Sequence, residues 1–220
     1  MGGRFWNVFL NILYPPRCPA CRVFVEQHGA WCPACLATIL AVRQINTAEH
    51  RLQFLDSCRV VCEYTGGLKR VIHDMKFRQQ KKYGVHLQWL LAGSQLSLYT
   101  PVIDYVVPVP LHQERLQERG YNQAEVIFKK WARQEKLVWQ PDLLMRCRST
   151  VPQWELSSAQ RRANIKGAFA VTRPEMVKTK HILLADDIIT TGITLDECAR
   201  VLKKSGAASV HALAVASGAR

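Results

Sequence analysis

The sequence has few acidic residues and no long hydrophobic run. It carries 17 Asp and Glu against 30 Lys and Arg, which gives a formal net charge of +13 at pH 7. No stretch reaches the length of about 18 apolar residues that a membrane-spanning helix needs. The apolar run at residues 5–13 contains two Asn, ends before Pro15-Pro16 and lacks the small-residue cleavage site of a secretory signal. We therefore expect a cytoplasmic protein without a transmembrane segment, in which residues 5–13 dock on the protein or, alternatively, on a membrane surface.

The shortage of acidic residues extends over the whole chain rather than over one tail. The excess of basic residues is largest in residues 51–100, with 8 basic and 3 acidic residues, and every other part of the chain shows it too. A folded basic surface fits this distribution better than a disordered basic arm does. Such a surface favours polyanionic partners, either nucleic acid or a phosphorylated small molecule.

Four of the eight cysteines lie in two identical Cys-Pro-Ala-Cys segments. Cys18 and Cys21 belong to the first segment, and Cys32 and Cys35 to the second. Two such turns can direct four thiolates to one Zn²⁺, and a closed set of four thiolates is typical of a structural site. The alternatives are a redox-active Cys-x-x-Cys pair and a chance cluster. We expect structural zinc in a small N-terminal module over residues 1–50.

Strands and helices alternate through the rest of the chain. Apolar patterning predicts strands near residues 57–64, 102–110, 143–147, 168–171, 181–185 and 209–216, and helices from residue 66 and over 83–98, 123–134 and 194–204. The continuous apolar strand at 181–185 and the terminal strand–helix–strand unit predict an α/β domain with an open, mainly parallel sheet over residues 51–220. In the last helix, the spacing of Asp196 and Arg200 predicts an i, i+4 ion pair on the solvent face.

The most informative segment follows the strand at residues 181–185. Asp186 and Asp187 are predicted to end this strand, and a turn then leads into the last helix. Two adjacent carboxylates can accept hydrogen bonds from a ribose diol. The polar groups of the turn can surround a phosphate, and they belong to Thr190, Thr191, Gly192 and Thr194. The segment therefore predicts a ribose 5-phosphate site, with a receiver-like Mg²⁺ site or simple helix capping as the alternatives.

This segment closely resembles the PRPP-binding motif of type I phosphoribosyltransferases, where PRPP is 5-phosphoribosyl 1-pyrophosphate. The resemblance implies PRPP with Mg²⁺ as the ligand, and Asp186 and Asp187 as catalytic residues that hold the ribose diol. It also implies a pyrophosphate loop, to which Arg119, a third catalytic candidate, and Gly120 fit. A mobile loop that closes over the substrate is implied as well. Its candidate residues are Arg148, Arg161 and Arg162. For each of them, the alternative is a solvated position on the surface.

Together with the cysteine segments, three stretches resemble the ComF/GntX family over essentially the whole chain. They are Glu118-Arg119-Gly120-Tyr121-Asn122-Gln123, Arg162-x-Asn164-x-x-Gly167-Ala168-Phe169 and the Asp-Asp-x-x-Thr-Thr-Gly segment. The resemblance implies a role in natural competence and in the handling of incoming single-stranded DNA, with proteins of the DNA-uptake machinery as candidate partners and the inner membrane as a candidate place of peripheral attachment. Two alternatives stay open: an active phosphoribosyltransferase of nucleotide salvage, and a PRPP-sensing regulator without turnover.

Single-stranded DNA also fits the composition of the chain. The charge of +13 favours binding to phosphates, and exposed tryptophans would add stacking surfaces for bases. The six candidates are Trp6, Trp31, Trp89, Trp131, Trp139 and Trp154. The alternative is that most of them lie in the core, as we expect for the tryptophan on the apolar face of the helix at 123–134.

Overall fold

A six-stranded sheet forms the centre of the protein. The structure is a computed structural model that describes residues 14–94, 102–150 and 158–218. The strand order is β1-β2-β8-β7-β3-β4, and every neighbouring pair is parallel except β1 with β2. The strands are β1 (Leu40–Ile45), β2 (Ser57–Glu63), β3 (Tyr105–Pro108), β4 (Val138–Trp139), β7 (His181–Ile189) and β8 (Ser209–Ser217). The predicted α/β fold with a mainly parallel sheet is therefore confirmed.

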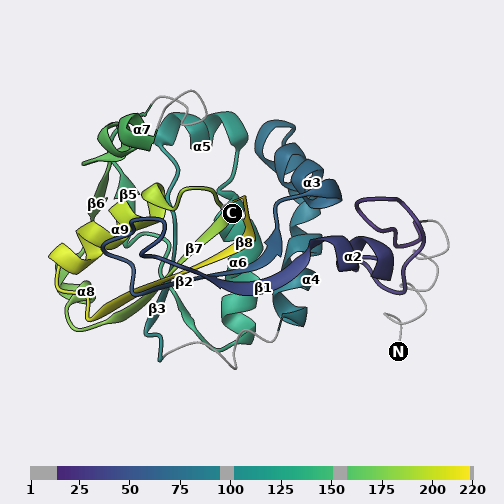
Figure 1. Ribbon diagram of the computed structural model, residues 1–220, viewed down its shortest axis with the longest axis horizontal. Coiled ribbons are helices and arrows are strands. Elements are labelled where there is room, and N and C mark those ends of the chain that lie inside the picture. The colour runs from purple at the N-terminus through teal and green to yellow at the C-terminus, as the bar shows by residue number, and fades with distance from the viewer. Residues whose placement is uncertain (1–13, 95–101, 151–157, 219–220) are drawn as a thin grey trace.

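Helices cover both faces of this sheet (Figure 1). On one face, the apolar side chains of α3 (Gly66–Phe77), α4 (Gly84–Gly93) and α6 (Gln123–Gln134) share a core with the sheet. On the other face, α9 (Ile193–Lys204) packs with the separate antiparallel pair β5 (Leu144–Arg146) and β6 (Phe169–Val171). The remaining elements are short: α2 (Pro33–Ile39), η1 (Lys81–Tyr83), α5 (Gln113–Arg119), α7 (Ser158–Ile165) and α8 (Pro174–Val177). No helix among the described residues is long and apolar enough to cross a membrane.

Strand β7 is longer than its apolar pattern predicts. The pattern ends the strand before Asp186, but the structure continues it to Ile189, because β8 supplies a partner as far as Ser217. Strand β3 pairs with β7 only up to Ala185. The last four residues of β7 therefore extend past their neighbour on one side, and this leaves room for a ligand at the carboxyl edge of the sheet.

The predicted ion pair between Asp196 and Arg200 is wrong. Arg200 instead forms two hydrogen bonds of 2.7 Å to the carboxylate of Glu197. Asp196 is buried and accepts a hydrogen bond of 2.8 Å from the N–H of Phe54. The chain that precedes β2 packs over the first turn of α9, so the carboxylate of Asp196 faces protein rather than solvent.

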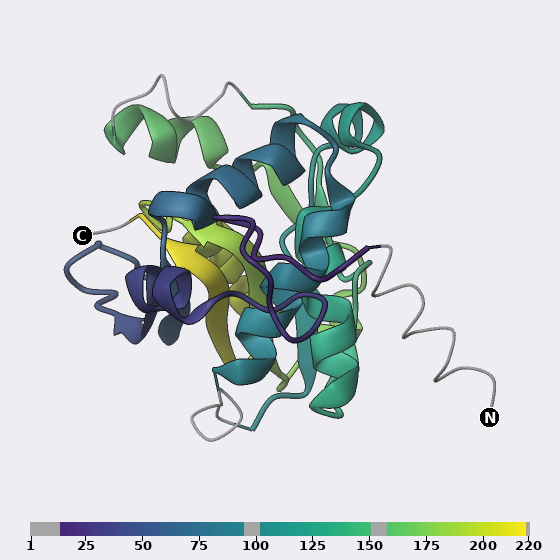
Figure 2. The ribbon, with the colours of Figure 1, turned by 90° about the vertical axis from the view of Figure 1, so that its right-hand side faces the viewer.

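The N-terminal region packs against helices α3 and α4, as Figure 2 shows for the purple segment and the blue helices. Trp31 donates a hydrogen bond of 3.1 Å from Nε1 to the carbonyl of His86 in α4. Strand β1 leaves this region and becomes the edge of the main sheet through its antiparallel pairing with β2. The boundary at residue 50 stays a prediction.

Candidate functional site

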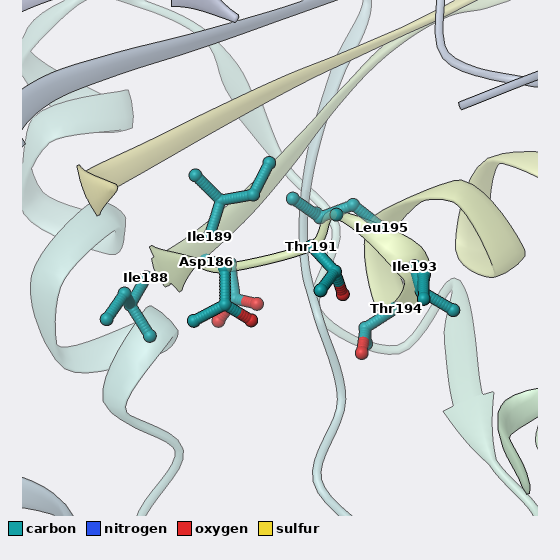
Figure 3. Close-up of a pocket in the computed structure, with 9 residues that line it drawn as sticks. Asp186, Ile188, Ile189, Thr191, Ile193, Thr194 and Leu195 are labelled. Atoms are coloured by element: carbon teal, nitrogen blue, oxygen red, sulfur yellow. The ribbon is translucent and has the colours of Figure 1, made fainter. Parts of the chain in front are cut away.

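The turn between β7 and α9 lines a pocket at the carboxyl edge of the sheet. The pocket is formed by residues 186 and 188–195. In Figure 3 the carboxylate of Asp186 and the hydroxyls of Thr191 and Thr194 point to the same side of the turn. Thr190 is exposed, whereas Thr191 and Thr194 are half-buried. Because α9 begins here, its first backbone N–H groups and its dipole favour an anion at this position.

Gly192 determines the shape of this turn. It precedes the first residue of α9 with φ of +75°, a backbone conformation that side chains other than that of glycine rarely adopt. A Cβ atom at this position would lie 2.7 Å from Cδ1 of Leu52. The backbone angle therefore favours glycine, and a Cβ atom would in addition displace the side chain of Leu52.

The two adjacent carboxylates have different surroundings. Successive residues of a strand point to opposite faces, and only Asp186 lines the pocket. Its Oδ1 accepts a hydrogen bond of 2.8 Å from the N–H of Asp187. Asp187 is buried, and its Oδ2 lies 2.9 Å from Nζ of Lys76. Burial and the negative charge of Asp187 raise the pKa of Asp186 to about 8, so a ligand that needs this carboxylate charged must displace a proton at neutral pH.

The predicted pyrophosphate loop lies between α5 and α6. Gly120 ends α5 with φ of +78°, and Arg119 is half-buried and donates a hydrogen bond to Oε1 of Gln123. The guanidinium of Arg119 is close enough to the carboxylate of Asp187 for their opposite charges to interact. Arg119 therefore lies close to the carboxylate of Asp187.

Two residues of this loop fix its place. Asn122 accepts a hydrogen bond of 2.9 Å from the N–H of Ala124 at the start of α6, and its Nδ2 donates one of 3.0 Å to the carbonyl of Val109. Tyr121 donates a hydrogen bond of 2.6 Å to the carbonyl of Met75 in α3. The loop is thus tied both to the end of β3 and to α3.

The arginines of the predicted mobile loop contact neighbouring backbone in this structure. Arg148 donates hydrogen bonds of 2.8 and 2.9 Å to the carbonyls of Asn164 and Lys166. Arg162 donates one of 2.8 Å to the carbonyl of Arg51, and Arg161 is half-buried. Residues 151–157 lie outside the described residues. A role of these arginines in ligand binding stays a prediction.

The four predicted zinc ligands come together at one point. The Sγ atoms of Cys18, Cys21, Cys32 and Cys35 all lie within 4.8 Å of one another, close enough to bind one tetrahedral Zn²⁺. Burial raises the pKa of the Cys18 thiol, but hydrogen bonds from nearby backbone N–H groups more than offset this and bring it to about 7. Burial and the neighbouring cysteine side chains raise the pKa of Cys35, so binding of zinc to the four thiolates has to release protons.

Comparison with known proteins identifies both parts of the chain. The model of the phosphoribosyl transferase domain matches residues 126–220, and that of the double zinc ribbon domain matches residues 9–45. A DNA utilization protein YhgH of Salmonella typhimurium is 30% identical over 201 residues, 88% of this chain and 87% of the relative. Competence protein F of Haemophilus influenzae is 35% identical over 162 residues, 71% of this chain and 70% of the relative. The chain belongs to the ComF family.

Membership of the ComF family agrees with the α/β fold and with a structural zinc site at the four cysteines. Two cationic residues near the carboxylate pair of this ComF-family chain were not found from the sequence. Lys76 follows Leu68 and Ile72 at intervals of four, so its place in the inward row of α3 was a usable signal. Arg146 gave no such signal, because only the tertiary fold brings β5 close to Asp186. Its Nε is buried and has no hydrogen-bond partner among the described residues.

Proposed function

We propose that this ComF-family protein binds PRPP with Mg²⁺ at the turn between β7 and α9. The observation that carries the proposal is the pocket that combines the Thr-Thr-Gly-x-Thr turn, the N-terminus of α9 and Asp186. The match of residues 126–220 to the phosphoribosyl transferase domain supports the same ligand. The 5-phosphate would bind Thr190, Thr191, Gly192 and Thr194, and the ribose diol would bind Asp186, which lines the pocket. Asp187, the second predicted diol ligand, is buried against Lys76 and would support Asp186 from behind.

The charges around the pocket suit a departing pyrophosphate. In the reaction of this fold, pyrophosphate leaves C1 of the ribose through an oxocarbenium-like state and a nucleophile replaces it. The guanidinium of Arg119, beside the flexible Gly120, would hold the leaving group, and Mg²⁺ would offset the charge on its oxygens. Asp186, supported by the buried Asp187, would fix the ribose during this step. Arg148, Arg161 and Arg162 would belong to the loop that closes over the ligand.

Thermal unfolding with and without PRPP and Mg²⁺ tests the binding site. At one hundred times Kd, PRPP should stabilise the wild type by about 2.7 kcal/mol, and the double variant Asp186→Asn/Asp187→Asn should show no shift. The control Asp142→Asn/Glu175→Gln removes two exposed carboxylates and should respond like the wild type. A wild type that does not respond to PRPP contradicts the proposal.

Turnover distinguishes the enzymatic alternative from the regulator without turnover. Release of pyrophosphate in the presence of a nucleobase would identify a phosphoribosyltransferase of the salvage type. Binding of PRPP without release for any base would favour a regulator that senses PRPP, and would leave the binding site itself intact.

We also propose that the protein handles single-stranded DNA, as the names of its relatives, DNA utilization protein and competence protein, indicate for those proteins. The described tryptophans do not offer the predicted stacking surface. Trp31 and Trp131 are buried, Trp89 and Trp139 are half-buried, and Trp6 and Trp154 lie outside the described residues. A different aromatic side chain, Phe77 at the end of α3, is 62% exposed.

The outer face of α3 and η1 combines basic and aromatic side chains. We call this surface the α3 ridge, and it consists of Lys69, His73, Phe77, Arg78, Lys81 and Lys82. The rings of His73 and Phe77 lie 4.9 Å apart. Nζ of Lys69 and of Lys82 lie 6.0 and 5.9 Å from the ring centres of Tyr64 and Tyr83. Among the described residues, no carboxylate lies within 4 Å of the three lysines. Cations beside the half-buried rings of Tyr64 and Tyr83, together with the exposed ring of Phe77, favour a single strand, whose phosphates and unstacked bases can both be bound.

Fluorescence anisotropy with a labelled oligothymidylate tests the α3 ridge. Phe77→Ala should weaken binding by about 1–3 kcal/mol, and Lys81→Gln/Lys82→Gln should also reduce the dependence of Kd on salt. Phe24 is the matched control because it is also 62% exposed but lies near the cysteine cluster. Equal losses for Phe77→Ala and Phe24→Ala would contradict the assignment of the ridge.

A further inference from the structure

Lys76 is the one cation of α3 that faces the carboxylate pair. Its Nζ lies 2.9 Å from Oδ2 of Asp187, with 21% of the lysine side chain and 3% of the aspartate side chain exposed. Phe77, the next residue, points to solvent. Lys76 is therefore held in a specific direction instead of extending into water like the lysines of the α3 ridge.

Several other groups face the two carboxylates. Arg119 on α5 and Tyr64 after β2 interact electrostatically with Asp187, and the charge of Asp186 acts on groups of β2, β5 and α9. The latter are Cys58 on β2, Arg146 on β5 and Cys198 on α9. Of the cations in this set, Lys76 is the one with a nitrogen within 4 Å of a carboxylate oxygen among the described residues. It provides the closest positive charge to a buried pair of like charges, and it lowers the pKa of Asp186 from the higher value that burial and Asp187 alone would give.

The other end of α3 contacts the cysteine cluster. A Cβ atom at Gly67 would lie 2.2 Å from Cβ and 3.0 Å from Cα of Ala20, the residue before Cys21. Arg70 donates a hydrogen bond to the carbonyl of Ala20. The first turn of α3 is thus packed directly on the first Cys-Pro-Ala-Cys segment, and a helix transmits a shift of one end to the other because its backbone is rigid.

We propose that Lys76 is a positioning residue for the Asp186–Asp187 pair and that the first cysteine segment holds it there by its contact with Gly67. The proposal rests on the PRPP site proposed above. Lys76 fixes the direction of the Asp187 carboxylate and adds a positive charge beside a polyanionic ligand. The zinc module then acts on ligand binding through α3, although it contributes no residue to the pocket.

Calorimetric titration of PRPP with Mg²⁺ into three variants tests this. Lys76→Met should raise Kd at least about tenfold, as expected when one partner of a buried ion pair is truncated. It should also raise the pH at which PRPP binding is half-maximal. Loss of packing alone would not cause this change. Lys76→Arg keeps the charge and should recover most of the affinity and the wild-type pH profile. Gly67→Ala forces α3 away from Ala20 and should weaken PRPP binding too.

Matched controls decide between position and general stability. Lys130→Met removes an exposed lysine of α6, and Gly93→Ala adds a methyl group where no atom lies within 4 Å. Both should leave Kd unchanged. If Lys76→Met does not fold, Lys76→Gln takes its place. Unchanged affinity and pH profile in the Lys76 variants overturn the role of Lys76, and unchanged affinity in Gly67→Ala overturns the role of the cysteine segment. A wild type that does not bind PRPP would instead refute the proposed function.

Discussion

At the scale of single residues, Gly192 combines two requirements that can be separated by experiment. Gly167 has a similar φ of +70°, but no atom lies within 4 Å of the place where its Cβ would be. Gly167→Ala should therefore cost only backbone strain of about 1–3 kcal/mol. Gly192→Ala should cost more, because of the contact with Leu52, and should also abolish PRPP binding. Urea unfolding measures both losses, and equal values would contradict the importance of the contact.

The pKa of Asp186 makes the stability of the protein depend on pH. Burial and Asp187 raise this pKa to about 8 from the ordinary 3.8. Between these values the folded protein binds more protons than the unfolded chain, so the free energy of unfolding should fall as the pH rises through this window. Asp186→Asn removes the titrating group and should flatten the profile. Urea unfolding from about pH 5 to about pH 8.5 checks this, and identical slopes for both proteins would refute it.

At the scale of elements, the sequence predicts the helices and strands whose bounds depend on residues that are close together in the sequence. The helix at 123–134 has the predicted bounds, because its buried Ile127, Phe128 and Trp131 recur at helical spacing. The end of β7 could not be predicted, because its last residues are held by β8 and the two carboxylates interrupt the apolar pattern. For the same reason the sequence did not show that Asp187 turns towards α3 while Asp186 lines the pocket.

Loss of zinc from the N-terminal module should loosen one specific neighbour, the first turn of α3. Cys18→Ser should lower the zinc content measured by mass spectrometry, and Cys147→Ser should not, since Cys147 is exposed and lies outside the cluster. Because Gly67 packs on Ala20, loss of zinc should also speed amide hydrogen exchange in the first turn of α3, and leave α6 unchanged. Faster exchange in α6 to the same extent would indicate global destabilisation instead.

At the scale of the whole molecule, the candidate site is assembled from distant parts of the chain. Its phosphate turn could be predicted, because strand, turn and helix follow one another within residues 181–204. Arg146 could not, since it reaches this edge only after β5 has packed on the sheet; for Lys76 the inward row of α3 was visible in the sequence, but its contact with Asp187 was not. The charge of +13 likewise predicts a polyanionic partner but not the surface that binds it.

Helix α3 separates the two proposed binding surfaces, so PRPP and single-stranded DNA should bind at the same time. Lys76 faces the carboxylate pair, whereas Phe77 and the lysines of the α3 ridge face solvent. Saturating PRPP with Mg²⁺ should therefore change the Kd for oligothymidylate only slightly, through the added negative charge behind the helix. That charge is screened beyond a Debye length of about 10 Å at 0.1 M salt. Anisotropy titrations at several fixed PRPP concentrations distinguish the outcomes. A Kd for DNA that increases in proportion to PRPP would mean that both ligands compete for one site, and that the strand enters the pocket instead of lying along α3.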